Sequence, residues 1–323
     1  MKQSSPFKLY FALGIIIPMI IMSMTASWWI PDQSEHANTM HIALATQKPG
    51  TVINQIQIKD GSYKEFHDIE LKDDAVILNI NGESIRMDSN ELYSDNIQDN
   101  VVQKNFYLGS DRFGRDYLSR LILGSRVSLM AGFISILISL FIGTFLGLLA
   151  GYYGGKIDKA IMWLVNVMWS VPTLLLAIAI TLSLGKGMWQ VFLAIGLTMW
   201  VEVARILRGK VIVEREKEYV LALKTLGVSN FRIIKNHILP NVFHPIIIIC
   251  AANFSTAILL EAGLSFLGIG AESPIPTWGK MIKDHYSYIV LDKAYLALLP
   301  GLGILLLVMA FMSLGNYLKE KLV

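Results

Sequence analysis

The stretch VSLMAGFISILISLFIGTFLGLLA, residues 127–150, contains no charged side chain. About 20 consecutive apolar residues are enough for a helix to cross the roughly 30 Å hydrocarbon core of a bilayer. The stretch therefore predicts a transmembrane helix. The whole chain agrees, because 54% of its 323 residues are hydrophobic and 16% are charged, against about 25% charged residues in a typical soluble domain.

On either side of this stretch, five more apolar segments are long enough to span a bilayer. They are approximately Leu9–Ile30, Ala160–Leu184, Met188–Leu207, Asn241–Leu260 and Ala294–Tyr317. The first is too long for a typical signal peptide and ends in Trp28-Trp29, so we expect residues 1–30 to be an uncleaved anchor. Pro172 and Pro300 interrupt two spans and permit bends. We predict an all-α integral membrane protein with six transmembrane helices.

Lysine and arginine side chains mark one side of the membrane. They gather before the first span, at Lys156 and Lys159, in residues 205–235 and at the C-terminal end. Threading six spans alternately puts all four groups on one side, which the positive-inside rule assigns to the cytoplasm. Residues 31–105, with six basic and thirteen acidic residues, fall on the other side. We expect a multi-pass protein of the cytoplasmic (inner) membrane, with both termini in the cytoplasm.

The stretch GSDRFGRD, residues 109–116, has two glycines at the spacing of a phosphate-binding loop. Such a loop needs Lys and then Ser or Thr after its last glycine, to reach the phosphates and Mg²⁺. Those positions hold Arg115 and Asp116 here, and a carboxylate repels phosphate. The topology also puts the stretch outside the cytoplasm. We expect no cofactor on this chain, so that any ATP acts on a partner.

Few polar features lie within the spans. Gly143, Gly147 and Gly151 form a strip of small residues that lets another helix approach closely. Glu202 and Arg205 are three positions apart and form a candidate intramembrane ion pair or substrate contact. The single cysteine lies in an apolar run, and the histidines have no metal-ligand spacing. We therefore predict neither a metal site nor a catalytic site.

Residues 210–240, KVIVEREKEYVLALKTLGVSNFRIIKNHILP, have a different organisation. Residues 214–226 have helical spacing, and one side of this helix carries Tyr219, Ala222, Leu223 and Leu226. Gly227 is expected to end the helix in a left-handed conformation, and Ser229 to cap a second helix that ends at Pro240. Two short basic helices favour a docking element for a cytoplasmic partner over a merely solvated loop.

This segment resembles the cytoplasmic coupling loop of the membrane permease subunits of binding-protein-dependent ABC importers, whose pattern is E-A-A-x-x-x-G-(x)₉-I-x-L-P. Alignment on Gly227 places Leu239-Pro240 at the final L-P. The chain departs from the pattern with Leu221 for Glu, Leu223 for Ala and His237 for Ile. The resemblance implies an ATPase-coupling loop formed by Glu218, Tyr219, Leu221, Ala222, Leu223, Gly227, Leu239 and Pro240.

Further stretches resemble the dipeptide, oligopeptide and nickel branch of this family. They are LGSDRFGRDYLSRLILGSRVSL (108–129), EAGLSFLGIG (261–270) followed by PTWGKMI (276–282), and LALLPGLGILLLVMAFMSLGNYLKEKL (296–322). The first carries a signature of the second of two paired permeases, at Gly109, Asp111, Gly114, Arg115 and Asp116. We expect this signature to form a short amphipathic helix on the outer face.

The resemblance implies a five-helix permease core over residues 106–323, in a transport subunit that is not itself an enzyme. Its expected partners are a second permease, two ABC ATPase subunits or a fused pair that bind ATP and Mg²⁺, an extracytoplasmic binding protein that delivers di- or oligopeptides, and the lipid bilayer, but no nucleic acid. Nickel or metal-chelate import is the alternative within the family. A secondary carrier is a more distant one, since it needs ion-coordinating charges in broken helices.

Residues 31–105 are longer than the external segment usual in this family. Alternating apolar and polar residues in TVINQIQI (51–58) and VILNINGESIRM (76–87) predict strands, with a type I′ turn at Asn81-Gly82. We expect a small β-rich extracytoplasmic insertion. It either contacts the binding protein or the second permease, or it is a lineage-specific decoration.

Overall fold

The computed structural model describes residues 6–59, 63–66, 68–72, 75–80, 83–92, 94 and 100–322. The chain divides into two compact units. Residues 1–25 and 124–323 form one, called here the helical unit, and residues 26–123 form the other, called the β-containing unit. Residues 106–123 therefore lie in the β-containing unit, where Phe106 packs against Leu44 and Ile53.

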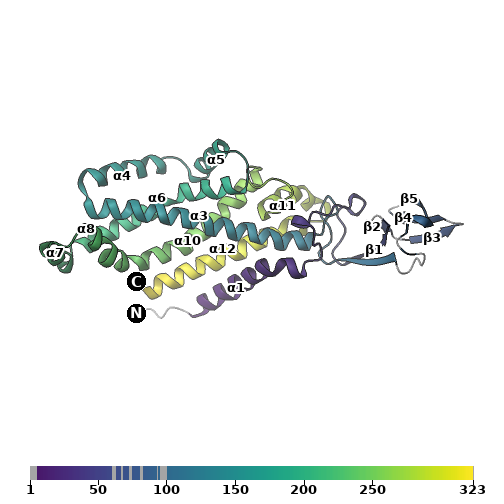
Figure 1. Cartoon of the computed structure of the whole chain (residues 1–323), viewed down its shortest axis with the longest axis horizontal. Helices are drawn as coiled ribbons and strands as arrows, with labels where there is room; N and C mark the ends of the chain where they lie inside the picture. The colour runs from purple at the N-terminus through teal and green to yellow at the C-terminus, as the bar shows by residue number, and fades with distance from the viewer. Residues whose placement is uncertain are drawn as a thin grey trace. The chain divides into compact units, whose positions relative to one another are not determined.

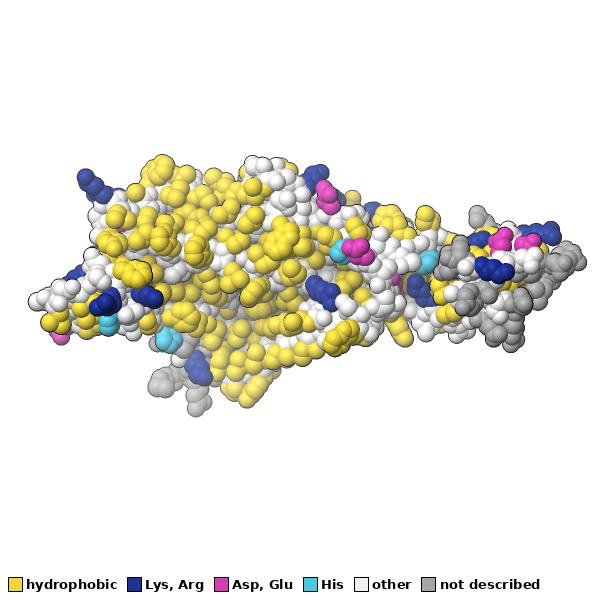
Figure 2. Space-filling model, viewed as in Figure 1, with side chains coloured by type: hydrophobic (Ala, Val, Ile, Leu, Met, Phe, Trp, Pro, Cys, Tyr) yellow, Lys and Arg dark blue, Asp and Glu magenta, His cyan; other side chains and the backbone are white. Residues whose placement is uncertain are grey.

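Long apolar helices build the helical unit (Figure 1). The helices that are long and apolar enough to cross a membrane are α1 (Pro6–Trp29), α3 (Tyr117–Tyr153), α6 (Met188–Arg215), α10 (Phe243–Leu267) and α12 (Tyr295–Leu322). Hydrophobic side chains cover most of the visible face of this unit (Figure 2). Shorter helices are α7 (Glu218–Thr225), α8 (Asn230–Ile233), α9 (Leu239–Asn241) and α11 (Trp278–His285).

The third predicted span is not a single straight helix. It consists of α4 (Gly155–Trp169) and α5 (Thr173–Leu184), which are bent by 93° at the break between them. Pro172 stands directly before α5, and its missing N–H and fixed φ prevent the first helix from continuing. The described residues thus contain five candidate spans, or six if the bent pair counts as one. Pro300, in contrast, lies inside α12, which continues through it.

The two termini of the helical unit lie at the same end (Figure 1). Lys8, near the start of α1, forms an ion pair with Glu320, near the end of α12. The helices α7 and α8 are at this end too, while α4 and α5 together lead from it to the start of α6 at the opposite end. Counting the bent pair as one span therefore makes an even number of crossings.

The glycine strip of α3 packs against α6. A Cβ atom on Gly143 would lie 2.7 Å from the carbonyl oxygen of Trp200, and one on Gly151 would lie 2.9 Å from that of Arg208. Real Cβ atoms do not come this close to a backbone, so the close contact requires glycine. The predicted role of the strip in helix packing is confirmed.

The β-containing unit holds two three-stranded antiparallel sheets, ordered β2-β1-β6 and β3-β4-β5. The strands are β1 (Thr51–Gln57), β2 (Tyr63–Phe66), β3 (Asp68–Lys72), β4 (Ala75–Ile80), β5 (Glu83–Asp88) and β6 (Val101–Phe106). Apolar side chains that alternate along β1, β4 and β5 form its core, including Ile56, Val76, Leu78 and Met87. The predicted strands are confirmed; Ile80 pairs with Glu83, and the predicted turn between them lies outside the described residues.

Candidate functional site

Gly227 ends α7 as the sequence predicts. Its φ of +76° is left-handed, a conformation that favours glycine. The N–H of Gly227 donates to the carbonyl oxygen of Lys224 over 3.0 Å, and the N–H of Val228 donates to that of Leu223 over 3.1 Å. These two bonds satisfy carbonyls that the end of a helix leaves free.

The second helix differs from the prediction at both ends. Ser229 occupies the position before α8, but its side chain makes no capping hydrogen bond. The helical path does not stop at Pro240: it passes from α8 through a π-helical turn at Ile234–Ile238 into α9, and breaks at Val242. Pro240 has no N–H to donate to a carbonyl oxygen of the preceding turn. The wider π turn directly before it allows the helix to continue without this hydrogen bond.

The buried side of α7 is centred on Val220 instead of the predicted face. Val220, Ile233 and Ile238 are fully buried and pack in one cluster with residues of α6. Tyr219 and Leu223 are partly buried at the edge of this cluster, but Ala222 is exposed and Leu226 is 78% exposed. Helical spacing correctly groups residues on a face, but it does not say which face the rest of the protein covers.

A hydrogen-bonded junction holds α7 to its neighbours. Glu214, near the end of α6, is buried and accepts hydrogen bonds from the Tyr219 hydroxyl (2.7 Å) and from Nδ2 of Asn241 in α9 (3.0 Å). Lys217 forms an ion pair with its other oxygen at 2.7 Å. Burial and the hydrogen bond to Glu214 raise the pKa of Tyr219. Glu214 therefore links α7 directly to α6 and α9.

A second connection joins α8 to the end of α3. The hydroxyl of Tyr152 donates to Oδ1 of Asn230 over 2.7 Å, and the ammonium of Lys224 lies 5.1 Å from the centre of the Tyr152 ring. Arg215, the last residue of α6, donates to the carbonyl oxygens of Gly151 and Tyr152. Sequence reasoning missed both connections, because these residues come from segments about 60 to 80 positions apart.

The outward side of α7 and α8 exposes large apolar residues. Leu221, Leu226 and Phe231 are 52%, 78% and 72% exposed, and we call them, with the exposed lysine and arginine side chains around them, the α7–α8 surface. The basic residues are Lys217, Lys224, Arg232 and Lys235. An exposed apolar patch with a charged rim is typical of a protein-binding site.

Some of the predicted coupling residues are exposed to solvent, and the others pack inward. Glu218, Leu221, Ala222, Gly227 and Pro240 are exposed. Tyr219, Leu223 and Leu239 pack inward against the cluster around Val220. Sequence reasoning missed Phe231 as part of the outward side, although its position directly after Ser229 and Asn230, among charged residues, is an indication of exposure.

The GSDRFGRD signature forms a tight turn and not the short amphipathic helix expected. Nη2 of Arg115 lies 2.6 Å from Oδ2 of Asp111, and both side chains are almost completely buried. The N–H groups of Phe113 and Arg115 donate to Oδ1 of the same carboxylate, which competes with helical hydrogen bonding. Oδ2 of Asp116 accepts from the N–H of Ser119 over 2.7 Å and so caps α3, which begins at Tyr117.

The two glycines of this signature both have left-handed backbone, with φ of +76° at Gly109 and +73° at Gly114. A Cβ atom on Gly114 would lie 1.8 Å from the carbonyl oxygen of His41. The turn therefore fits against residue 41 only with glycine at position 114. The Asp111 carboxylate and the Arg115 guanidinium are occupied by one another, whereas Oδ1 of Asp116 is buried without a hydrogen-bond partner among the described residues.

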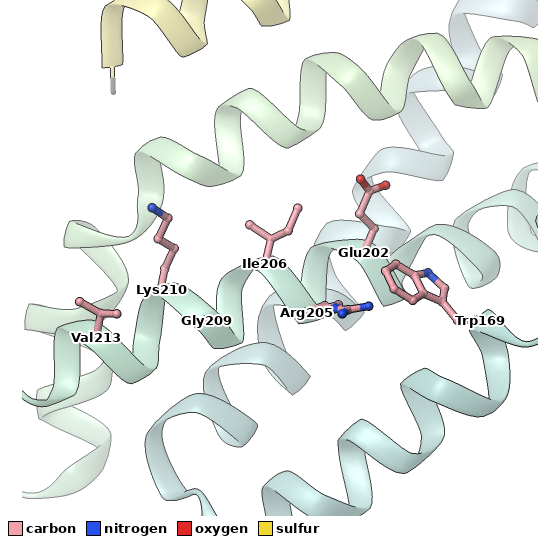
Figure 3. Close-up of a pocket in the computed structure, with 7 residues that line it drawn as sticks. All are labelled: Trp169, Glu202, Arg205, Ile206, Gly209, Lys210 and Val213. Carbon is pink, nitrogen blue, oxygen red and sulfur yellow. The ribbon is translucent and has the colours of Figure 1, made fainter.

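The candidate ion pair between Glu202 and Arg205 is not formed among the residues that the structure describes. Arg205 lies over the ring of Trp169, 4.2 Å from its centre, whereas Glu202 projects away from it (Figure 3). The electron-rich face of an indole ring attracts a guanidinium group, so Trp169 takes the place of the predicted partner.

Comparison with known proteins places this fold in a family. Residues 143–323 match the family described as binding-protein-dependent transport system inner membrane component. The chain is 43% identical to a dipeptide transport system permease protein of Alkalihalophilus pseudofirmus, over 67% of this chain and 71% of that protein. It is 39% identical to a glutathione transport system permease protein of Pectobacterium atrosepticum, with the same coverage.

Solved structures agree on the fold. An inward-facing conformation of a methionine ABC transporter superposes with a TM-score of 0.52 at 16% identity, covering 64% of this chain and 97% of that chain. A second crystal form of the same transporter gives a TM-score of 0.51 at 18% identity.

Proposed function

The chain belongs to the inner membrane components of binding-protein-dependent transport systems, and we propose that it forms half of the membrane pathway of an ATP-driven ABC importer for peptides. The relatives named for dipeptide and glutathione transport support the substrate class. The transport subunit itself carries out no chemical reaction, and ATP and Mg²⁺ bind to its partners.

The α7–α8 surface is the observation that carries the proposal. It presents Leu221, Leu226 and Phe231 to solvent at the end of the helical unit that also carries both termini. Basic residues gather on this side, which indicates the cytoplasm. A cytoplasmic ATPase subunit would bury these apolar side chains in a complementary groove, as partner proteins do with an exposed apolar anchor.

Movement of that partner would reach the membrane helices through two rigid contacts. The junction around Glu214 connects α7 to α6 and α9, and the bond between Tyr152 and Asn230 connects α8 to α3. ATP binding would draw the ATPases together and rock these helices, so that the pathway opens to the outer side, as alternating access requires. A second, similar permease completes the pathway, and an extracytoplasmic binding protein delivers the peptide.

The experiment that tests this proposal is purification of the chain in mild detergent through a tag after Val323, followed by mass spectrometry of the proteins that come with it. We expect a second permease and one or two ABC ATPases. The purified complex, reconstituted in liposomes with its binding protein and ATP, should accumulate tri-alanine. A chain that purifies alone in several detergents contradicts the importer proposal.

Coupling can be tested at the α7–α8 surface itself. The double variant Leu226→Asp/Phe231→Asp should lose the ATPase from the purified complex, because it places two charges in the docking interface. Val213→Asp is the matched control, since Val213 is a similarly exposed apolar residue, at 64%, on α6 outside this surface. Equal retention of the ATPase by both variants would contradict docking at α7 and α8.

A further inference from the structure

One face of α6 carries charges that nothing covers. The buried residues of α6 on the opposite side include Val201, Val203, Ala204 and Leu207. Glu202, Ile206 and Lys210 are exposed. These three project from the same side of the helix (Figure 3). In the described part of the chain, neither the Glu202 carboxylate nor the Lys210 ammonium group has a hydrogen bond or ion pair. Both lie on a helix long and apolar enough to cross a membrane.

The depth of Glu202 makes exposure to lipid unfavourable. It is 14 residues (202 − 188) after Met188, the first residue of α6, or about 21 Å along the axis at about 1.5 Å per residue. A hydrocarbon core of about 30 Å that begins near Met188 would therefore include Glu202. Ionisable side chains at such a depth face the interior of a bundle or a water-filled cavity, so this face of α6 must meet protein or water in the membrane.

A cavity of about 580 Å³ opens beside this face, between α6, α10 and α12. Glu202, Ile206 and Lys210 line it from α6, and Lys319 lines it from the end of α12. The rest of its wall is mostly apolar, with hydroxyl and amide groups at Thr256 and Asn316. A carboxylate thus lines the cavity farther from the end that carries the α7–α8 surface, and two ammonium groups line it nearer that end.

This charge arrangement matches the two ends of a short peptide. Glu202 and Lys210 are eight positions (210 − 202) apart on one helix, which is about 12 Å along its axis. An extended chain spans about 3.3–3.6 Å per residue, so three or four residues have this length. A free peptide carries an ammonium at one end, a carboxylate at the other and mostly uncharged groups between them.

We propose that this cavity is the chain's half of the peptide pathway, in which Glu202 binds the ammonium terminus of the passing peptide and Lys210 its carboxylate terminus. The inference rests on the proposed function and adds to it a location and two specificity-determining residues. The second permease closes the open side of the cavity. The charges then remain in water between peptides, which avoids burying them unpaired.

The first part of the test asks whether water reaches this face in the assembled importer. Ile206→Cys keeps both charges and is made in a Cys250→Ala background, because Cys250 is the only native cysteine. The control is Phe141→Cys, an 80% exposed position on α3 within the charge-free stretch 127–150. In the reconstituted complex, a membrane-impermeant methanethiosulfonate should modify Ile206→Cys at least about tenfold faster than Phe141→Cys, and tri-alanine delivered by the binding protein should slow that reaction.

The second part asks whether the charges act on the peptide. Glu202→Gln and Lys210→Gln should each lower ATP-dependent uptake of tri-alanine about tenfold, corresponding to about 1.4 kcal/mol. Lys186→Gln, which removes an exposed lysine outside the cavity, should leave uptake unchanged. The binding protein and the ATPases are unsubstituted throughout, so peptide capture and ATP hydrolysis are not altered directly.

The outcomes separate this inference from the function on which it rests. A transporting complex in which Ile206→Cys is as unreactive as Phe141→Cys means that lipid or the second permease covers the face, and overturns the proposal. Normal uptake by both charge variants overturns the roles of Glu202 and Lys210. An unsubstituted complex that imports no peptide contradicts the proposed function itself.

Discussion

The hydroxyl of Tyr219 in α7 donates a hydrogen bond to Oε1 of Glu214 in α6 over 2.7 Å. The same carboxylate also binds Asn241 of α9 and Lys217, which directly precedes α7. One buried group therefore connects the end of α6, the start of α7 and α9. Such a shared acceptor makes these elements move together, because any separation breaks charge-assisted hydrogen bonds.

Removing this carboxylate should weaken coupling. Glu214→Ala leaves the Tyr219 hydroxyl without its acceptor and removes one of the two hydrogen bonds that Nδ2 of Asn241 donates, the other being to Tyr219. We expect it to destabilise the junction by about 1–3 kcal/mol and to lower peptide uptake per ATP hydrolysed several-fold. Glu216→Ala is the control, since Glu216 is an exposed glutamate in the same short segment between α6 and α7. The ratio of uptake to hydrolysis in proteoliposomes measures the effect, and an identical ratio for both variants would contradict it.

Gly227→Asp should leave the protein inserted but abolish coupling. No atom lies within 4 Å of a Cβ atom built on Gly227, so the side chain itself has room. Gly227→Asn is a matched control, because Asn and Asp both adopt left-handed backbone more readily than other residues but only Asp adds a charge. We expect Asn to retain most of the uptake and Asp to lose it. Normal uptake by Gly227→Asp would refute a role of this turn in docking.

Gly114→Ala should disrupt the β-containing unit. Its Cβ atom would lie 1.8 Å from the carbonyl oxygen of His41, a clash that adds to the roughly 1–2 kcal/mol for left-handed backbone. Gly50→Ala carries only the second penalty, since Gly50 has φ of +82° with nothing within 4 Å. Thermal unfolding of the purified chains should show a clearly larger loss for Gly114→Ala; equal losses would mean that the turn relaxes.

Acidification should loosen the segment after α1. Asp32 is buried, which raises its pKa, but hydrogen bonds from Ser34 and Thr39 outweigh burial, and its pKa lies below the ordinary value of 3.8. The carboxylate therefore stabilises the folded state above pH 3.8, and this stabilisation is lost as the pH falls below it. Hydrogen exchange of residues 32–39, corrected for its intrinsic pH dependence, should accelerate at pH 3.

Asp32→Asn provides the control for this effect. Its neutral amide cannot titrate, so its local protection should be lower at pH 7 and should change less between pH 7 and pH 3. The same acid-induced change in both proteins would assign it to another group.

Much of the architecture could be predicted from the sequence. Apolar runs located the spans, because a helix in lipid must satisfy its own backbone and cover itself with apolar side chains. Spacing also located the glycine strip of α3, and the conformational freedom of glycine located the end of α7 at Gly227. The break at Pro172 was predicted as a bend, but its angle of 93° depends on how α4 and α5 pack against α6.

The candidate site was predictable in part. Resemblance located the coupling segment at residues 210–240, but the sequence placed Leu226 on the same side as Tyr219. In the structure Val220 packs against the cluster that contains Leu207 and Ile238, which turns Leu226 outward. The family-like signature 109–116 was expected to form a short amphipathic helix, whereas Asp111 accepts hydrogen bonds from backbone N–H groups within a tight turn.

The sequence by itself determined the class of protein, the candidate spans and the position of the turn at Gly227, since these depend on composition and on residues close together in the chain. Only the tertiary structure decided which face of α7 is outward, which partner Arg205 takes and which face of α6 stays open. Those outcomes depend on side chains from distant segments, such as Trp169 beside Arg205. Local periodicity contains no information about such contacts.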